Sequence, residues 1–176
     1  MAERCVQGRA VMVDLHAHYG KERKLVGYSE LMHICKSDGV QIEKGDMVVF
    51  HTGLAQMIVE MKGSPDGQLL HRACPVLNGA DDRLLQWITE SGVAVIIADN
   101  FAVEQFPAPP ATKRAAALPL HEHCLFKLGV HLGELWYLTE LAQWLRDHAR
   151  NRFLLTAPPL RLPGAAGSPV TPVATV

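Results

Sequence analysis

Several short motifs that mark common enzyme classes are missing from this sequence. It contains no GxGxxG or GxxxxGK(S/T) phosphate-binding loop, no GxSxG nucleophile elbow and no HExxH zinc motif. Nucleotide binding and serine-hydrolase chemistry therefore lose their best sequence support. Catalytic or binding residues have to be sought outside these motifs.

Paired cysteines, basic clusters and long apolar runs are also absent. The four cysteines are widely separated without a CxxC pair, which predicts reduced, mostly buried thiols rather than disulfides or a zinc ribbon. Lysine and arginine (17) nearly balance aspartate and glutamate (18), so nucleic acid is not an expected partner. The longest apolar runs, VAVIIA and MVVF, are far shorter than the roughly 20 residues of a membrane span. The first ten residues also lack the apolar segment of a secretory signal, so we expect a cytoplasmic protein without a membrane partner.

What the sequence does contain is a regular alternation of apolar strands with amphipathic helices. RAVMVDL (9–15) and MVVFHTG (47–53) predict strands, and VAVIIAD (93–99) predicts an interior strand because it is apolar on both faces. The proline-containing tail (160–176) suits an edge strand, and residues 54–78 give little signal. The predicted class is α/β or mixed α+β, in a single domain covering residues 1–176.

Helix starts and one long connection complete this outline. Ser29, either Asp81 or Asp82, and Thr139 are candidate N-caps of three helices. The proline- and alanine-rich segment 101–119 is a long connection of the kind that often serves as a binding loop.

The stretch LPLHEHCLFKLGVHLGELW (118–136) concentrates histidines and a glutamate among apolar residues. Imidazole nitrogen and carboxylate oxygen are the usual ligand mix for zinc or manganese in hydrolytic sites. His121 and Glu134 are too far apart for one helical face, but a helix, a turn at Gly129 and a returning strand would bring them together. The alternatives are surface histidines on an amphipathic helix and a buried glutamate satisfied by hydrogen bonds.

Two other pairs are weaker candidates for a site. His16 and His18 form an HxH pair that we expect at a strand end, where both side chains share a face; they pair as metal ligands or simply face solvent. Asp99 and Asn100 end the predicted interior strand, at the edge where ligands collect in α/β sheets, although local capping explains them equally well. The isolated histidines receive no role; they are His33, His51, His71 and His148.

Five stretches, taken in order, resemble the cyclase family of metal-dependent hydrolases, which contains bacterial kynurenine formamidase and isatin hydrolase. They are GRAVMVDL, VQIEKGDMVVFHTG, SGVAVIIADNFAVEQFP, LPLHEHCLFKLGVHLGELWYLTELA and FLLTAPPLRLPGAAGSPVTPVATV. The resemblance covers almost the whole chain. It implies a swivelling β/β/α fold, a homo-oligomer, and hydrolysis of an amide or cyclic amide at a divalent metal.

The resemblance also implies metal ligands at two positions, His121 and Glu134, with His123 as the substitute if the register shifts by two residues. The family's HxGTHxDxPxH signature, which supplies the other ligands and a proton-transfer histidine, does not occur in the 176 residues. The chain therefore resembles the carboxy-terminal part of a family member, an N-terminally truncated domain that lacks the first strands. Its zinc or manganese site is expected to be incomplete, and no residue is assigned to proton transfer.

Two functions follow from this resemblance. The first is an arylformamidase-like hydrolase that acts on N-formylkynurenine or a related small-molecule amide, with the missing ligands supplied by a partner chain or by further sequence. The second is a non-catalytic remnant that associates with itself or with another protein. In either case we expect the chain alone to bind metal poorly, to hydrolyse little and to be poorly soluble as a monomer, because missing strands leave apolar surface uncovered.

Overall fold

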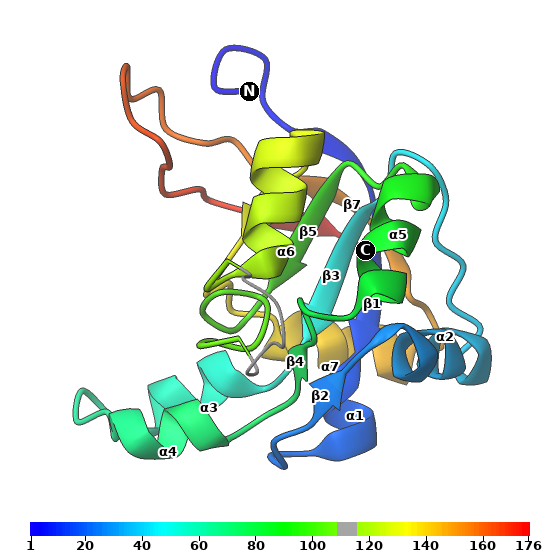
Figure 1. Cartoon of the computed structure of the whole chain (residues 1–176), viewed down its shortest axis with the longest axis vertical. Helices are drawn as coiled ribbons and strands as arrows, with labels where there is room; N and C mark the ends of the chain where they lie inside the picture. The colour runs from blue at the N-terminus through cyan, green and yellow to red at the C-terminus, as the bar shows by residue number, and fades with distance from the viewer. Residues whose placement is uncertain (109–115) are drawn as a thin grey trace.

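The computed structural model describes residues 1–108 and 116–176, and its centre is a six-stranded sheet (Figure 1). The strand order is β6-β5-β3-β1-β7-β8. The four strands from β6 to β1 are parallel, whereas β7 and β8 pair antiparallel at the other edge. The mixed α/β class predicted from the sequence is confirmed. The strand bounds are β1 Gln7–Asp14, β3 Met47–His51, β5 Val95–Ala98, β6 His131–Gly133, β7 Arg152–Thr156 and β8 Val173–Thr175.

Both faces of the sheet are buried, which explains why its strands are continuously apolar. In β1, Val11 and Val13 enter the core on one face, while Ala10 and Met12 enter the core on the other. All four are at most 3% exposed. Successive side chains of a strand point to opposite faces, so an alternating polar pattern would have placed polar groups in a core.

Helices cover the two faces unequally. On one face lie α2 and α5 together with the continuous helical segment formed by α6 and η1, whereas α7 covers the other face. The bounds are α2 Tyr28–Ser37, α5 Asp82–Ser91, α6 Pro119–His121, η1 Glu122–Leu128 and α7 Thr139–Asp147. Within the described residues, no helix has the length and apolar character needed to cross a membrane.

A smaller unit lies at the end of the sheet where the parallel strands finish (Figure 1). It contains a two-stranded parallel sheet of β2 and β4, a short helix α1, and two helices, α3 and α4, that share a small core. This unit includes residues 54–78, where the sequence pattern predicted no clear secondary structure. The bounds are α1 Leu15–Tyr19, β2 Leu25–Val26, α3 Leu54–Glu60, α4 Gly67–Arg72 and β4 Val76–Leu77.

Most of the predicted elements are present, but two of the predicted caps are wrong. The interior position of residues 93–99 and the edge strand in the tail are confirmed. The cap at Asp81 is confirmed too, since its carboxylate accepts the amides of Arg83 and Leu84 in the first turn of α5. Ser29 is not a cap, because α2 begins at Tyr28, whose amide donates to Asp81 across the fold. Thr139 is not a cap either, because it is the first residue of α7 and the cap position belongs to Leu138.

The predicted binding loop is described only in part. Residues 101–108 and 116–119 are included, and the remainder of that segment, 109–115, lies outside the described residues.

A buried ion pair fixes the start of β1 against the turn before β3. The Asp46 carboxylate is 3% exposed and accepts from Arg9 Nε at 2.7 Å, Arg9 Nη2 at 2.8 Å and the Glu43 amide at 2.7 Å. Burial raises the pKa of Asp46, but the hydrogen bonds from Arg9 and Glu43 outweigh it and hold the pKa below its usual value. The folded state therefore favours the ionised carboxylate.

Replacing Asp46 by Asn should lower the free energy of unfolding by about 1–3 kcal/mol at pH 7, because the Arg9 guanidinium loses the more buried of its two carboxylate partners and keeps only Glu43. Since the folded-state pKa is lowered, the stabilisation is complete above the ordinary aspartate pKa of about 4 and is lost as the pH falls through the folded-state value. Urea unfolding from pH 7 to pH 3 measures both effects. The difference in the free energy of unfolding between wild type and Asp46→Asn should become smaller as the pH falls. A difference that stays constant from pH 7 to pH 3 would contradict the proposed role of the Asp46 carboxylate.

Candidate functional site

The segment 118–136 folds back on itself and brings His121 and Glu134 together. Leu120, fully buried, anchors the start of the helical segment, and the chain reverses at Gly129, whose φ is +68°. β6 then runs parallel to β5 and delivers Glu134 just beyond its end. His121 Nε2 lies 2.9 Å from Glu134 Oε1. The proximity expected from the sequence is therefore present.

A third residue, Glu104, holds the other side of the His121 ring. Its side chain is fully buried, and Oε1 lies 2.9 Å from His121 Nδ1. The same oxygen accepts the His121 amide at 2.9 Å, and Oε2 accepts the Leu120 amide at 2.9 Å. The carboxylate thus caps the helical segment and contacts the ring at the same time. Sequence analysis missed this role, because Glu104 lies in a connection outside the histidine-rich stretch 118–136 and carries no motif of its own.

The two carboxylates stabilise a positive charge on the imidazole. The hydrogen bond to Glu104, followed by that to Glu134, raises the pKa of His121 to about 9, although burial opposes the shift. The hydrogen bond from His121 in turn lowers the pKa of Glu134 against the effect of burial. Without a bound cation, the cluster is therefore an imidazolium between two carboxylates at neutral pH.

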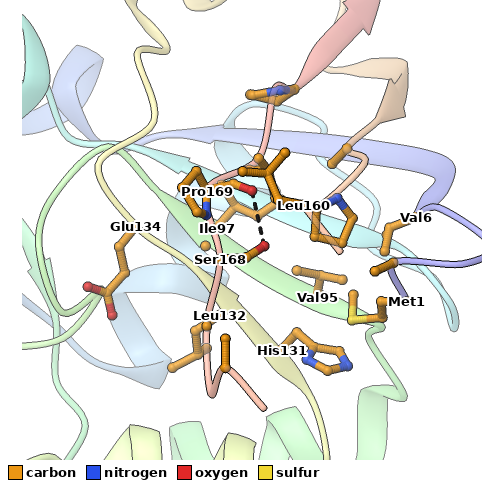
Figure 2. A pocket seen from close by; sticks show the side chains of 18 of the residues that line it. Met1, Val6, Val95, Ile97, His131, Leu132, Glu134, Leu160, Ser168 and Pro169 are labelled. Atoms are coloured by element: carbon orange, nitrogen blue, oxygen red, sulfur yellow. Dashed lines mark hydrogen bonds between the residues drawn. The ribbon is translucent and has the colours of Figure 1, made fainter. Parts of the chain in front are cut away.

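A cavity of about 1400 Å³ opens beside these residues and has both His121 and Glu134 in its wall. Its floor is largely apolar and comes from strands β5 and β6. The first residues of the chain and the segment 157–172 complete the wall. Figure 2 shows Glu134 on one side of this cavity, with Met1, Val6 and His131 on the other.

His121 and Glu134 alone do not make a complete metal site. Among the residues that the structure describes, no group of three or more histidine, cysteine, aspartate or glutamate side chains is arranged to hold a metal ion. One imidazole nitrogen and one carboxylate oxygen, 2.9 Å apart, could supply two of the ligands of a metal ion.

Comparisons with known proteins show the family of this chain and its fold. The sequence model of the Cyclase family matches residues 1–105, more than half of the chain. This chain belongs to the cyclase family. A solved structure of a novel cyclase has 30% sequence identity over 96% of this chain, with a TM-score of 0.80. A search of curated proteins gave no match.

Two less similar structures show the same fold as this cyclase chain. Isatin hydrolase A from Ralstonia solanacearum has 20% identity over 96% of the chain, with a TM-score of 0.66. A potential metal-dependent hydrolase with cyclase activity has 17% identity over 96% of the chain, with a TM-score of 0.58. The cyclase chain spans 53% of the novel cyclase, 59% of the isatin hydrolase and 64% of the third protein.

The other histidines considered as ligands of the cyclase chain lie elsewhere. His123 Nε2 is 2.8 Å from the Thr89 hydroxyl on α5, so it contacts the neighbouring helix rather than Glu134. His131 lies in β6 with its side chain in the cavity wall.

The HxH expectation for His16 and His18 is wrong in its geometry. Asp14 ends β1 and its carboxylate accepts the Ala17 amide, which starts helix α1 instead of extending the strand. Two residues apart on a helix, the rings diverge. His16 Nδ1 lies 3.0 Å from the Gly20 carbonyl oxygen, and His18 Nε2 lies 2.8 Å from an Asp38 carboxylate oxygen.

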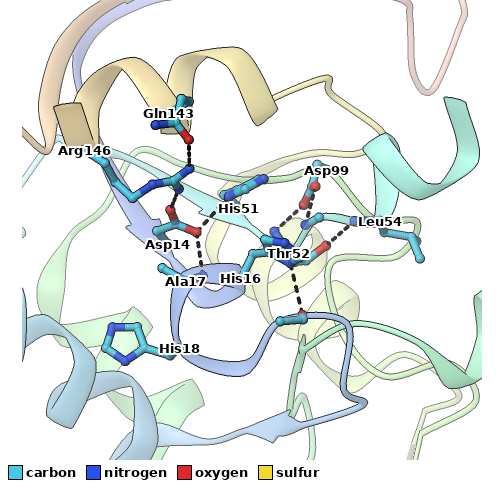
Figure 3. Close-up of polar contacts among 12 residues, drawn as sticks. Asp14, His16, Ala17, His18, His51, Thr52, Leu54, Asp99, Gln143 and Arg146 are labelled. Atoms are coloured by element: carbon cyan, nitrogen blue, oxygen red, sulfur yellow. Dashed lines mark hydrogen bonds and ion pairs between the residues drawn. The ribbon is translucent and has the colours of Figure 1, made fainter. Parts of the chain in front are cut away.

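A second polar cluster surrounds His51, for which sequence analysis predicted no role (Figure 3). His51 is 1% exposed, and its Nδ1 lies 2.7 Å from Asp14, which also pairs with Arg146 of α7. Burial raises the pKa of Asp14, but the hydrogen bond from His51 and the remaining partners hold it below its usual value. Within the described residues, His51 Nε2 has no hydrogen-bond partner. The ends of β1 and β3 therefore hold a buried network of Asp14, His51 and Arg146, whose residues do not line the cavity beside His121.

Asp99 and Asn100, the predicted pocket residues, do not line the cavity that contains His121 and Glu134. The Asp99 side chain is fully buried and accepts the Thr52 amide at 2.6 Å and the Gly53 amide at 2.8 Å. The Asn100 carbonyl accepts the amide of Leu135, next to Glu134, and its side-chain amide donates to the Val103 carbonyl. Both residues shape the edge of the sheet, and a contact with substrate stays a prediction.

The Asp99 contacts predict a structural effect. Replacing Asp99 by Asn should lower the free energy of unfolding by about 1–3 kcal/mol, because one of the two buried amides would face an amide donor instead of a carboxylate oxygen. Chemical denaturation measures this loss. Asp82→Asn, at an exposed carboxylate, is the control and should change stability by less than about 0.5 kcal/mol. Equal stability of the two variants would contradict the role of Asp99.

Proposed function

We propose that this chain forms part of a metal-dependent hydrolase that cleaves the carbon–nitrogen bond of an amide or cyclic amide. His121 and Glu134 are two of the metal ligands in this proposal. The observation that carries it is the 2.9 Å approach of His121 Nε2 to Glu134 Oε1 at the wall of a large cavity. The similar structures that are hydrolases support the proposal.

The donor chemistry fits a divalent cation. Zinc and manganese both accept imidazole nitrogen and carboxylate oxygen. Metal-binding histidines commonly donate their second ring N–H to a carboxylate, and Glu104 is in position to accept it from His121. Hydrolytic zinc sites use three protein ligands and a water, so further donors are needed beside His121 and Glu134. A partner chain or further sequence would supply them, and the greater length of the similar structures is consistent with that.

When bound, a divalent cation polarises a carbonyl and lowers the pKa of a coordinated water. The residues of this chain contribute binding and orientation. His121 and Glu134 present one nitrogen and one oxygen to the same point, while Ile97 and Leu132 give the cavity an apolar floor suited to a ring-bearing substrate such as an N-formyl aromatic amine or a cyclic imide. No proton-transfer residue of this chain is assigned.

Exposed apolar side chains favour a second function, self-association. Phe126 is 85% exposed, and Leu125, Leu160 and Leu162, all in the cavity wall, are about half exposed. Apolar surface of this kind marks contact sites between proteins. The chain would then act as a homo-oligomerising module without catalysis of its own. Sedimentation that showed a soluble monomer over a wide concentration range would contradict this alternative.

Metal titration tests the proposed ligands. Binding of Mn²⁺, followed by the paramagnetic resonance of the free ion, or of Zn²⁺, followed by calorimetry, should be weak but specific. His121→Ala and Glu134→Ala should each weaken it by more than the roughly 10- to 100-fold that loss of an outer-sphere partner costs. His123→Ala is the matched control, since His123 contacts Thr89, and it should bind as wild type does.

The same proteins address catalysis. With an N-formyl aromatic amine and Zn²⁺ or Mn²⁺, we expect little turnover from the chain alone, because His121 and Glu134 are too few ligands. Robust turnover that Glu134→Ala abolishes would show that a full ligand set is present. Equal metal affinity in all four proteins would show that the cation binds elsewhere and would overturn the proposed site.

A further inference from the structure

We infer that Glu104 is a positioning residue that fixes the ring orientation of His121 and keeps a proton on Nδ1, so that Nε2 is the ring atom that a cation would bind. The inference rests on the proposed function and goes beyond it, because it assigns a role to a residue that would not touch the metal. Its basis is the contact of one buried carboxylate with both the backbone and the ring of His121.

The ring contact goes beyond what helix capping requires. The amides of Leu120 and His121 would be satisfied by any acceptor at the start of the helical segment. Glu104 Oε1 also lies 2.9 Å from His121 Nδ1, and a carboxylate accepts only. Nδ1 must therefore carry a proton. Nε2 lies 2.9 Å from the Glu134 carboxylate and also carries a proton in the metal-free protein, so the Nε2 proton is the one that a cation would replace while Glu104 holds the proton on Nδ1.

The surrounding backbone is shaped to hold Glu104 in this position. Ala102 and Val103 both adopt positive φ angles, +67° and +57°, which is uncommon for residues with a side chain. Leu77 pairs with this turn, since its amide donates to the Val103 carbonyl. Gly79 provides the space, because a Cβ at that position would lie 1.7 Å from Glu104 Oε2. A strained turn and an obligatory glycine thus converge on the carboxylate.

The same turn also contacts the second proposed ligand. The Ala102 backbone contributes to the lowered pKa of Glu134, in addition to the hydrogen bond from His121. The loop 102–104 therefore borders both residues: it binds His121 through Glu104, and its Ala102 backbone acts on the Glu134 carboxylate. His121 Nε2 and Glu134 Oε1 are therefore brought together by the folded chain itself, without a bound ligand.

A proton resonance tests the ring contact without any metal. In protein labelled with ¹⁵N-histidine, a slowly exchanging Nδ1–H signal should be visible and should disappear in His121→Gln, which assigns it. Glu104→Gln should remove or strongly shift this signal, whereas Glu134→Gln should keep it. A signal unchanged in folded Glu104→Gln would overturn the inference.

Cation affinity tests the consequence. Glu104→Gln should weaken Zn²⁺ or Mn²⁺ binding by about 10- to 100-fold, as loss of an outer-sphere partner does elsewhere. Asp46→Asn is the matched control, because it also removes a buried carboxylate that binds backbone and side chain, at a site far from His121. It should leave the affinity within about twofold of wild type if the effect of Glu104 is local.

Further outcomes separate this inference from the proposed function. If Glu104→Gln does not fold, Glu104→Asp keeps the charge near the Leu120 amide and withdraws it from the ring, and it should lose the same signal. A cation affinity that depends on His121 and Glu134 but not on Glu104 overturns the positioning role alone. The Nδ1–H signal can depend on Glu104 while the cation affinity is the same in wild type and His121→Ala. That combination supports the positioning role of Glu104 and overturns the proposed function.

Discussion

Two-sided burial of the parallel strands is the constraint on which the other features depend. Because β1, β3 and β5 are covered on both faces, the polar groups gather where the strands end. In the parallel register Asp14 pairs with His51, Asp99 follows the next strand, and Glu134 follows the strand beyond that. One edge of the sheet therefore collects the charges that its interior excludes, as is general for ligand sites in α/β folds.

Each buried charge at this edge is matched to donors, and the partners differ in kind. Asp99 accepts two backbone amides and so shapes a turn, whereas Asp14 joins a histidine to an arginine of α7. Glu104 combines both patterns, with two backbone amides and one imidazole. A buried carboxylate without such partners would be strongly unfavourable. These hydrogen bonds position the carboxylates of this edge in the absence of a ligand.

The sequence predicted the parts of this arrangement that depend on local pattern. The strands were visible because two-sided burial demands continuous apolar residues, and His121 and Glu134 were visible because polar residues stand out in an apolar stretch. Glu104 was not, since its partner is distant in sequence and its loop resembles an ordinary connection. His16 was placed wrongly because the Asp14 carboxylate starts a helix there, a competition between capping and strand extension that a pattern of alternating residues does not reveal.

The charge balance of the His121 cluster is compatible with a cation beside Nε2 and Glu134. Glu104 and Glu134 contribute two negative charges, and His121, with its pKa raised to about 9 by these carboxylates, contributes one positive charge at neutral pH. One negative charge is left over beside a largely apolar cavity. A divalent cation that replaces the Nε2 proton would bring two positive charges to the same point and leave Glu104 paired with the Nδ1 proton. The geometry of the three side chains could persist through that exchange, because only the group between Nε2 and Glu134 changes.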